Sequence, residues 1–325
     1  MATGTATDRF DVILSTTLRN YRDTLVDNVS TEVALFNWLN KKGNKRVESG
    51  GEEIIVPVMY ALNDTVASYS GYDVIDVTPQ TGIGNARYEW KQAAGSVTIS
   101  GKELRQNNGE YAVINLLKSK TKQLEISLAN HFNERLFADG TGNEGKDVDG
   151  LALIIDATPA TGTVGGIDAS SYTWWRNYQT TGTKTSAAYD NLLSKMRTVY
   201  NTVSKGVDHP DFGITDQNVF EGYEGKLTAT INYNVGLVDT KTADFGFQNL
   251  KFKGMTLTWD ADCTAGYMYF INSKYLELVV HKDADFAMSD FVKPENQDAK
   301  VANILWMGNL VCSNRARQGV LTAIT

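Results

Sequence analysis

The stretch Gly109–Gly140, GEYAVINLLKSKTKQLEISLANHFNERLFADG, decides how the rest of the chain is organised. Apolar residues recur in it at steps of three and four, which places them on one stripe of a helix. Lys122, Glu125 and Asn133 fall on the opposite side, and Gly140 stands where a helix C-cap is expected. About 28 helical residues at 1.5 Å each predict a rod about 42 Å long, well above the average globular helix. The apolar stripe consists of Ile114, Leu117, Leu124, Leu128, Phe132 and Leu136, with Thr121 in its one gap.

The composition is ordinary for a soluble chain with a sizeable core. Of 325 residues, 42% are hydrophobic and 21% are charged. No apolar run is long enough to cross a bilayer, so we expect no membrane span. The N-terminus has no signal-peptide pattern, and folding in the cytosol is expected. We predict that the two cysteines, Cys263 and Cys312, are reduced and buried.

The charge is negative overall and unevenly distributed. A net charge of -7 argues against a chain that as a whole grips nucleic acid. Residues 1–46 hold seven Lys/Arg against five Asp/Glu, whereas residues 47–106 hold four against eight. These two segments could attract each other, within one chain or between neighbouring chains. Two independently solvated surfaces are the open alternative.

Two helices are predicted before residue 47. The first begins near Thr7 or Asp8, and the second, amphipathic one ends at Gly43. The basic run Lys41–Arg46, KKGNKR, is interpreted as a linker or a solvated turn. A nucleic-acid contact is the alternative.

Residues 47–106 predict an extended hairpin. Glu52–Tyr60 and Ala86–Ser100 have the composition of strands, with a Gly- and Pro-containing stretch between them. Pro57 indicates that the first is an edge strand. No obvious segment of the chain covers its apolar side chains, so we expect this hairpin to pack on another subunit. The candidate assembly residues are Tyr69, Tyr72, Tyr88 and Trp90, which lie in the same segment as Ile54, Ile55 and Val56.

The second half of the chain alternates short helices with strands. After the long helix we expect an apolar strand, a second helix ending at Gly206, and a strand followed by a helix capped by Asp216. Residues 250–325 are predicted to be rich in strands. The expected elements are strands at Leu151–Ile155, Asp211–Thr215, Ala299–Cys312 and Gly319–Ile324, a helix at Thr185–Gly206, and a hairpin turn at Asn272–Lys274.

Several motifs resemble ligand sites but favour plainer interpretations. Gly140, Gly142 and Gly145 form a lone GxGxxG, but a helix precedes it and a strand is expected after it, the reverse of a dinucleotide site. Asp147 and Asp149 lack the remaining positions of a calcium loop, so they predict a turn. Two DxD pairs could bind a cation and are interpreted as solvated strand ends: Asp260 with Asp262, and Asp283 with Asp285.

No catalytic motif is present. The three histidines are outside recognisable nucleophile motifs, and the chain has no GxSxG, HExxH or P-loop pattern. Trp174 and Trp175 favour core or subunit packing, with a carbohydrate or base platform as the alternative. We therefore expect no catalytic, cofactor-binding or metal-binding residues, and no cofactor. The histidines are His131, His209 and His281.

The order of these parts resembles the major capsid proteins of tailed bacteriophages, an α+β architecture known as the Hong Kong 97-type coat fold. The resemblance covers nearly the whole chain. It includes VDGLALII after the long helix, SYTWWRN, FKGMTLTWDAD, GYMYFINSKYLELVVHKDADF and the closing GNLVCSNRARQG. These motifs are diffuse, but they occur together and in order.

The resemblance implies a division of the chain into five parts. Residues 1–46 would form an N-terminal arm and residues 47–106 an extended E-loop hairpin. Residues 107–180 would form a peripheral domain with the long helix as its spine. Residues 181–295 would form an axial domain, and the strands of residues 296–325 would return to the peripheral domain.

The resemblance also implies a structural function. Such proteins assemble with copies of themselves into pentamers and hexamers of an icosahedral shell, which encloses double-stranded DNA without sequence-specific binding. The expected location is the virion, after assembly in the bacterial host cytoplasm. Such proteins often carry an N-terminal scaffolding segment, and the arm helix expected near Asp8 leaves no place for one. We therefore expect a separate scaffolding protein, with a processed form of the chain as the alternative, and also a portal. The alternatives are the shell of a bacterial nanocompartment with the same fold, or an unrecognised enzyme or tail module.

Overall fold

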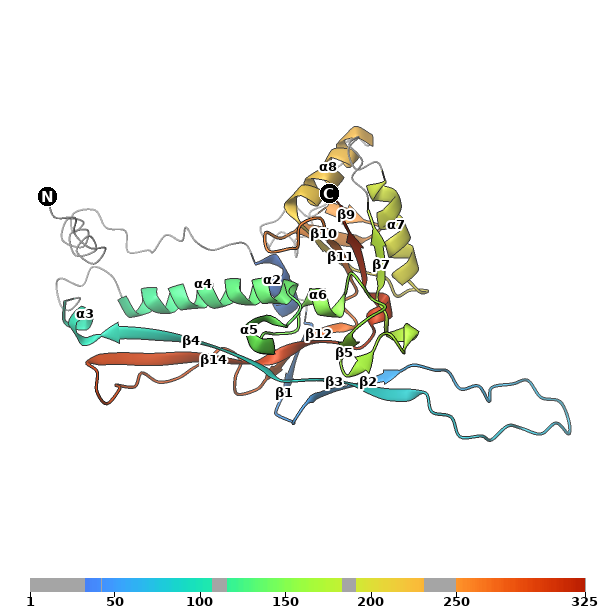
Figure 1. The fold of residues 1–325 in the computed structure, drawn as a ribbon, viewed down its shortest axis with the longest axis horizontal. Coiled ribbons are helices and arrows are strands. Elements are labelled where there is room, and N and C mark those ends of the chain that lie inside the picture. The colour runs from blue at the N-terminus through green and yellow to red at the C-terminus, as the bar shows by residue number, and fades with distance from the viewer. Residues whose placement is uncertain (1–32, 42, 107–115, 183–190, 231–249, 325) are drawn as a thin grey trace. The chain divides into compact units, whose positions relative to one another are not determined.

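The computed structural model describes residues 33–41, 43–106, 116–182, 191–230 and 250–324 (Figure 1). It confirms the predicted α+β class. The described residues divide into two compact units: residues 94–106, 116–130 and 286–305 form unit 1, and the others form unit 2. Within the described residues, no helix has the length and apolar character to span a membrane. The helix expected near Thr7 lies outside the described residues.

A six-stranded sheet forms the largest part of unit 2. Its strand order is β7-β15-β11-β8-β10-β9, with antiparallel pairing of β11 to both β8 and β15. Every residue of β8, β11 and β15 is buried, so both faces of these central strands are covered. The strands are β7 (Tyr178–Thr181), β8 (Phe212–Thr215), β9 (Leu250–Phe252), β10 (Met255–Trp259), β11 (Met268–Ile271) and β15 (Gly319–Thr322).

Helices cover this sheet. Helices α7 (Leu192–Val203) and α8 (Gln217–Thr230) pack on it through apolar side chains that repeat at helical spacing, as the sequence predicts. Helix α2 (Ala34–Lys41) is amphipathic as expected, and its Trp38 ring stacks on Phe212 of β8 at 4.2 Å. The shared core contains Met196, Val199, Val219, Tyr223, Met255, Leu257, Met268, Phe270 and Leu321.

A second group of strands in unit 2 corrects the interpretation of the basic run. Strand β1 (Lys45–Glu48) pairs in parallel with β12 (Leu276–His281), which pairs antiparallel with the end of β14 (Ala299–Cys312). Lys45 is bound to Asp285. The run therefore ends in a strand, because β12 supplies a ladder that no local pattern reveals.

Apart from the hairpin described below, the other elements that lie wholly in unit 2 are short. They are α5 (Gly142–Gly145), α6 (Leu151–Ile154), the two-stranded pair β5 (Thr163–Val164) and β6 (Ile167–Asp168), and the 3-10 helices η3 (Thr173–Trp175) and η5 (Arg315–Arg317). The expected strand at Leu151–Ile155 is wrong, because these residues form a single helical turn. Apolar runs of this length do not distinguish a buried strand from a buried helix.

Unit 1 contains parts of one long helix and two long strands. Helix α4 (Leu116–Phe137) has 22 residues, and the beginning of the predicted helix, residues 109–115, lies outside the described residues. Strand β4 (Lys91–Ser100) pairs with β14 and leads into α3 (Gly101–Gln106). Strand β13 (Ala287–Met288) also pairs with β14. Gly95 allows α4 to approach β4, since a Cβ there would lie 2.5 Å from Leu124 Cδ1.

The two closing strands are confirmed as β14 and β15; β14 pairs with β12, whereas β15 joins β11 and β7. Two further expectations about strands are wrong or incomplete. Asn272–Lys274 is no hairpin turn, because β11 and β12 belong to different sheets. The returning strand expected at Ala86–Ser100 is interrupted between β3 (Ile83–Tyr88) and β4. The five-part division remains a prediction.

Candidate assembly surface

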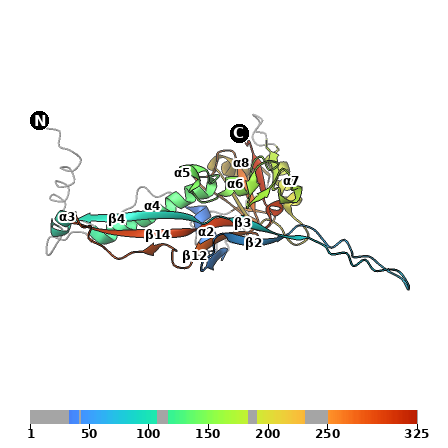
Figure 2. The ribbon, with the colours of Figure 1, turned by 60° about the horizontal axis from the view of Figure 1, so that its bottom comes forward.

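The predicted hairpin is present in unit 2. Strand β2 (Ile54–Met59) pairs antiparallel with β3, in register from Ile54 opposite Tyr88 to Met59 opposite Ile83. Pro57 is accommodated because β2 pairs with β3 alone among the described strands. Beyond these strands, residues 60–82 extend away from the rest of unit 2 (Figure 2).

The end of this hairpin exposes a concentration of large apolar side chains. Tyr69 is 67% exposed and Tyr72 is fully exposed. Such side chains scattered singly on a surface are normal, but a concentration on one projecting segment indicates an interaction site. We call residues 59–83 the hairpin tip. Its other exposed apolar side chains are Met59, Tyr60, Leu62, Val66, Val74, Ile75, Val77 and Ile83.

The hairpin tip is also acidic. It carries Asp64, Asp73 and Asp76, and it has no Lys, Arg or His. Its side chains make local hydrogen bonds, such as those that Asp76 Oδ1 accepts from the Thr78 hydroxyl and amide. These two bonds, the hydroxyl first, lower the pKa of Asp76. Local turns therefore shape the tip and leave its apolar side chains in water.

The base of the hairpin is packed on its own chain, which corrects part of the sequence interpretation. Ile54 and Val56 are buried, although the sequence suggested no cover for them. The β5–β6 turn packs on the neighbouring strand β3: the Arg87 amide donates to the Gly165 carbonyl at 2.8 Å, and a Cβ at Gly165 would lie 3.0 Å from the Tyr88 ring. The turn lies about 80 positions after β3 in the sequence, so no pattern within the hairpin itself could reveal this contact.

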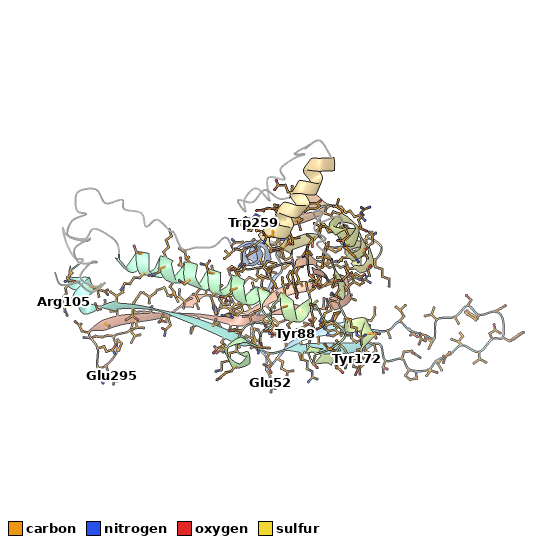
Figure 3. The ribbon with its side chains drawn as sticks, turned by 45° about the horizontal axis from the view of Figure 1, so that its top comes forward. Glu52, Tyr88, Arg105, Tyr172, Trp259 and Glu295 are labelled. Carbon is orange, nitrogen blue, oxygen red and sulfur yellow. The ribbon has the colours of Figure 1, made fainter. Side chains whose placement is uncertain are left out.

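Tyr88 belongs to this buried base. Its side chain is 2% exposed, its hydroxyl donates to the Cys312 carbonyl at 2.9 Å, and burial raises its pKa well above the ordinary value. Figure 3 labels it beside the strands rather than on the loop. Tyr88 is therefore not exposed for a neighbouring subunit in this conformation, and we remove it from the candidate surface.

Trp90 has an intermediate position. It follows β3, its Nε1 donates to the Gly51 carbonyl at 3.0 Å, and its ring meets the edge of His281. The four predicted assembly residues thus fall into two groups. Tyr69 and Tyr72 lie on the exposed tip, whereas Tyr88 and Trp90 are held by their own subunit.

The sequence reasoning missed most of the tip. Of the stretch between the strands it singled out only Tyr69 and Tyr72, yet Leu62, Val66, Val74 and Val77 are each more than three-quarters exposed. The frequency of Val, Ile, Leu and Tyr in a segment that also contains turn residues was the signal that could have identified them. Local propensity alone does not say whether such side chains are covered.

The DxD pair at the end of β10 is not a solvated strand end. Asp260 is buried, and its carboxylate accepts hydrogen bonds from the Ala34 and Leu35 amides and from Asn133. Burial raises the pKa of Asp260, and the neighbouring Asp262 charge raises it further. Asn133 was expected on the polar side of the long helix and is instead fully buried.

The other candidates are also engaged within the subunit. Asp147 pairs with Arg135, and the Asp149 carboxylate accepts from Asn309. Trp175 is buried and donates to the Val164 carbonyl. Both cysteines are free and buried, as predicted, and burial raises the pKa of each thiol. Within the described residues, no group of three or more His, Cys, Asp or Glu side chains is placed to hold a metal.

Comparison with known proteins identifies the fold. The capsid protein of cyanophage A-1(L) matches with a TM-score of 0.69 and 17% identity, over 94% of this chain and 96% of that one. The capsid of Myoviridae phage XM1 matches with a TM-score of 0.60 and 12% identity, over 99% of both chains. The SrpI encapsulin of Synechococcus elongatus PCC 7942 matches with a TM-score of 0.59 and 12% identity, over 99% of this chain and 96% of that one.

These likenesses establish architecture over nearly the full length. No family model matches the chain, and no curated protein matches it. The structural matches confirm the predicted Hong Kong 97-type coat fold. At these sequence identities the structural matches show only the fold. The function has to be argued from the surface of the protein.

Proposed function

We propose that this chain is the major capsid protein of a tailed bacteriophage, with copies of itself as its main partner. The hairpin tip carries the proposal. Its apolar side chains project from a well-packed base into water, and they can be buried only against the surface of a partner. In a closed shell, identical neighbours supply that surface at every position.

The proposed assembly forms pentamers and hexamers of an icosahedral shell around double-stranded DNA. The net charge of -7 supports enclosure without tight binding, because like charge disfavours contact with phosphates. A separate scaffolding protein and a portal are part of the proposal, as is location in the virion after assembly in the host cytoplasm. Nothing in the described surface calls for a catalytic activity, and we propose a purely structural role.

A hairpin deletion tests the role of the tip. Residues 63–80 are replaced by a short Gly–Ser turn that keeps β2, β3 and the Tyr60–Gly82 contact. We expect a folded subunit by circular dichroism that fails to form capsomers or shells by sedimentation. Shells from this variant would show that the tip is not the assembly arm.

A bacterial nanocompartment shell is the second candidate, because the encapsulin likeness covers the same length of chain. The contents of purified particles separate the two functions. Particles produced in the native host should contain DNA that resists nuclease until the shell is opened. Particles that contain a protein cargo and no protected DNA would favour the nanocompartment.

A further inference from the structure

The hairpin loop has a narrow attachment to the subunit. The Tyr60 amide donates to the Gly82 carbonyl at 2.9 Å, and the Ala61 amide donates to the same carbonyl at 3.4 Å. A Cβ at Gly82 would lie 2.7 Å from the Ala61 carbonyl oxygen, so this close approach requires glycine. Beyond this point, the described hydrogen bonds of the loop are local. The direction of the whole loop is therefore decided at Tyr60 and Gly82.

Aromatic rings hold this attachment point against the subunit. The Tyr60 ring lies over β3 at Gly84, where a Cβ would be 3.5 Å from Tyr60 Cε1. Its ring also stacks on Trp174, with centroids 5.4 Å apart and planes 21° apart. Tyr172 flanks Trp174 at 6.0 Å, and Figure 3 labels it near the base of the loop.

Trp174 is itself fixed to the core. It occupies η3 next to Trp175, and the two rings meet edge to face at 5.5 Å. Trp175 is buried, its Nε1 donates to the Val164 carbonyl at 2.9 Å, and its own carbonyl accepts from Arg315. Arg315 is fully buried. A continuous line of contacts thus joins the loop attachment to the interior.

Small movements at this point become large at the tip. About 11 residues on each side of the loop, at about 3.3 Å each, reach about 36 Å from the base. A rotation of about 10° at Tyr60 would displace the end of such a lever by about 6 Å. That displacement exceeds the spacing of neighbouring residues, so Tyr69 and Tyr72 would miss a fixed partner site.

We propose that Tyr60 and Trp174 form an aromatic clamp that sets the direction of the hairpin, with Trp174 as a positioning residue for assembly. Its role in assembly rests on the proposed function, whereas its control of loop direction does not. The clamp is built from rings that are partly exposed, so its loss leaves the buried base of β2 and β3 in place. The physical basis is the rigid, offset geometry of stacked aromatic rings.

The experiment measures loop direction and assembly separately. Spin labels at Ser70→Cys on the loop and Ser194→Cys on α7 report a distance distribution in unassembled full-length subunits; Cys263 and Cys312 are buried. Trp174→Ala should broaden or shift this distribution by several ångströms, and Trp174→Phe should restore most of it. Circular dichroism should show the same fold in all three proteins. An unchanged distribution in Trp174→Ala would overturn the clamp.

Assembly of the unlabelled variants is then compared by sedimentation. We expect at least a tenfold loss of shells for Trp174→Ala and recovery in Trp174→Phe. A changed distribution with normal shell yield would overturn the link between loop direction and assembly. If the unaltered chain formed no shells while Trp174→Ala changed the distances, the shell function would fail and the clamp would stand.

Discussion

The side-chain amide of Asn133 donates a hydrogen bond of 2.9 Å to Oδ1 of Asp260, and both residues are buried. Oδ2 of the same carboxylate accepts from the Ala34 amide at 3.0 Å and the Leu35 amide at 3.3 Å. Helix α2 begins at Ala34, and the backbone amides of its first turn have no acceptor within the helix. The Asp260 carboxylate supplies that acceptor. One carboxylate connects three segments that are far apart in the sequence: α2, α4 and the end of β10.

Removing this carboxylate should destabilise the subunit. In Asp260→Ala, two helix amides and the Asn133 side chain lose a buried acceptor, so we expect the free energy of unfolding to fall by about 3 kcal/mol. Urea denaturation of unassembled subunits measures it. Asp283→Ala is the matched control, because Asp283 is exposed in the other DxD pair and should change stability by less than about 0.5 kcal/mol. Equal effects of the two substitutions would contradict the role of Asp260 as a buried acceptor that stabilises the subunit.

The same residue predicts a pH dependence. Burial raises the pKa of Asp260, so the folded chain keeps this proton to a higher pH than the unfolded chain does. The resulting stabilisation is complete below the ordinary pKa near 4 and is lost as the pH rises through the folded pKa. Relative to Asp260→Asn, the unaltered chain should therefore lose stability as the pH rises above about 4. Urea denaturation across this range tests the sign, and a relative gain would contradict it.

Gly308 is a second position where a small substitution should lower the stability of the subunit. A Cβ there would press on the Val279 carbonyl oxygen, and it would lie 2.8 Å from Trp306 Cζ2. Because β12 and β14 are paired at this point, the backbone has little freedom to move away. We expect Gly308→Ala to lower the free energy of unfolding by about 3 kcal/mol.

A matched glycine provides the control for this substitution. Gly225 lies in α8, and a Cβ there would meet open space. Gly225→Ala should stabilise the subunit by about 0.5–1 kcal/mol, since alanine is the better helix former. Thermal denaturation of the two variants in parallel should give shifts of opposite sign; shifts of the same sign would refute the packing argument.

The exposed and the buried tyrosines of the hairpin should behave in opposite ways. The double substitution Tyr69→Ser/Tyr72→Ser removes apolar surface from the tip, so it should leave subunit stability within about 0.5 kcal/mol and abolish shell formation. Tyr88→Phe removes a buried hydrogen bond, so it should cost about 1–2 kcal/mol while shells still form. Sedimentation and urea denaturation of both variants provide the measurements. Loss of shells in Tyr88→Phe alone would return Tyr88 to the assembly surface.

Patterns with a local cause were predictable from the sequence. Hydrophobic periodicity and turn residues predict three such elements: the amphipathic α2, the part of α4 from Leu124 to Leu136, and strand β2. The hairpin followed from two apolar runs with Gly and Pro between them. The tip residues Tyr69 and Tyr72 could be proposed because nothing nearby in the sequence covers them.

Features that depend on distant partners were not predictable. Asn133 looked like a surface residue until Asp260, more than 120 positions later, supplied its partner. Strand β1 needs β12, and the burial of Tyr88 needs Gly165 and Cys312. In each case a non-local hydrogen bond or packing contact overrides the local polarity, which is all that a pattern in one sequence reports.

The central claim is that this chain assembles with itself into a closed shell through the hairpin tip. Electron microscopy of the purified chain, expressed alone and together with the scaffolding protein that we propose, tests it most directly. The account predicts capsomers or closed icosahedral particles from the unaltered chain and none from the chain with residues 63–80 replaced. A chain that stays monomeric under all conditions, or a loop-deleted chain that forms normal particles, would contradict it.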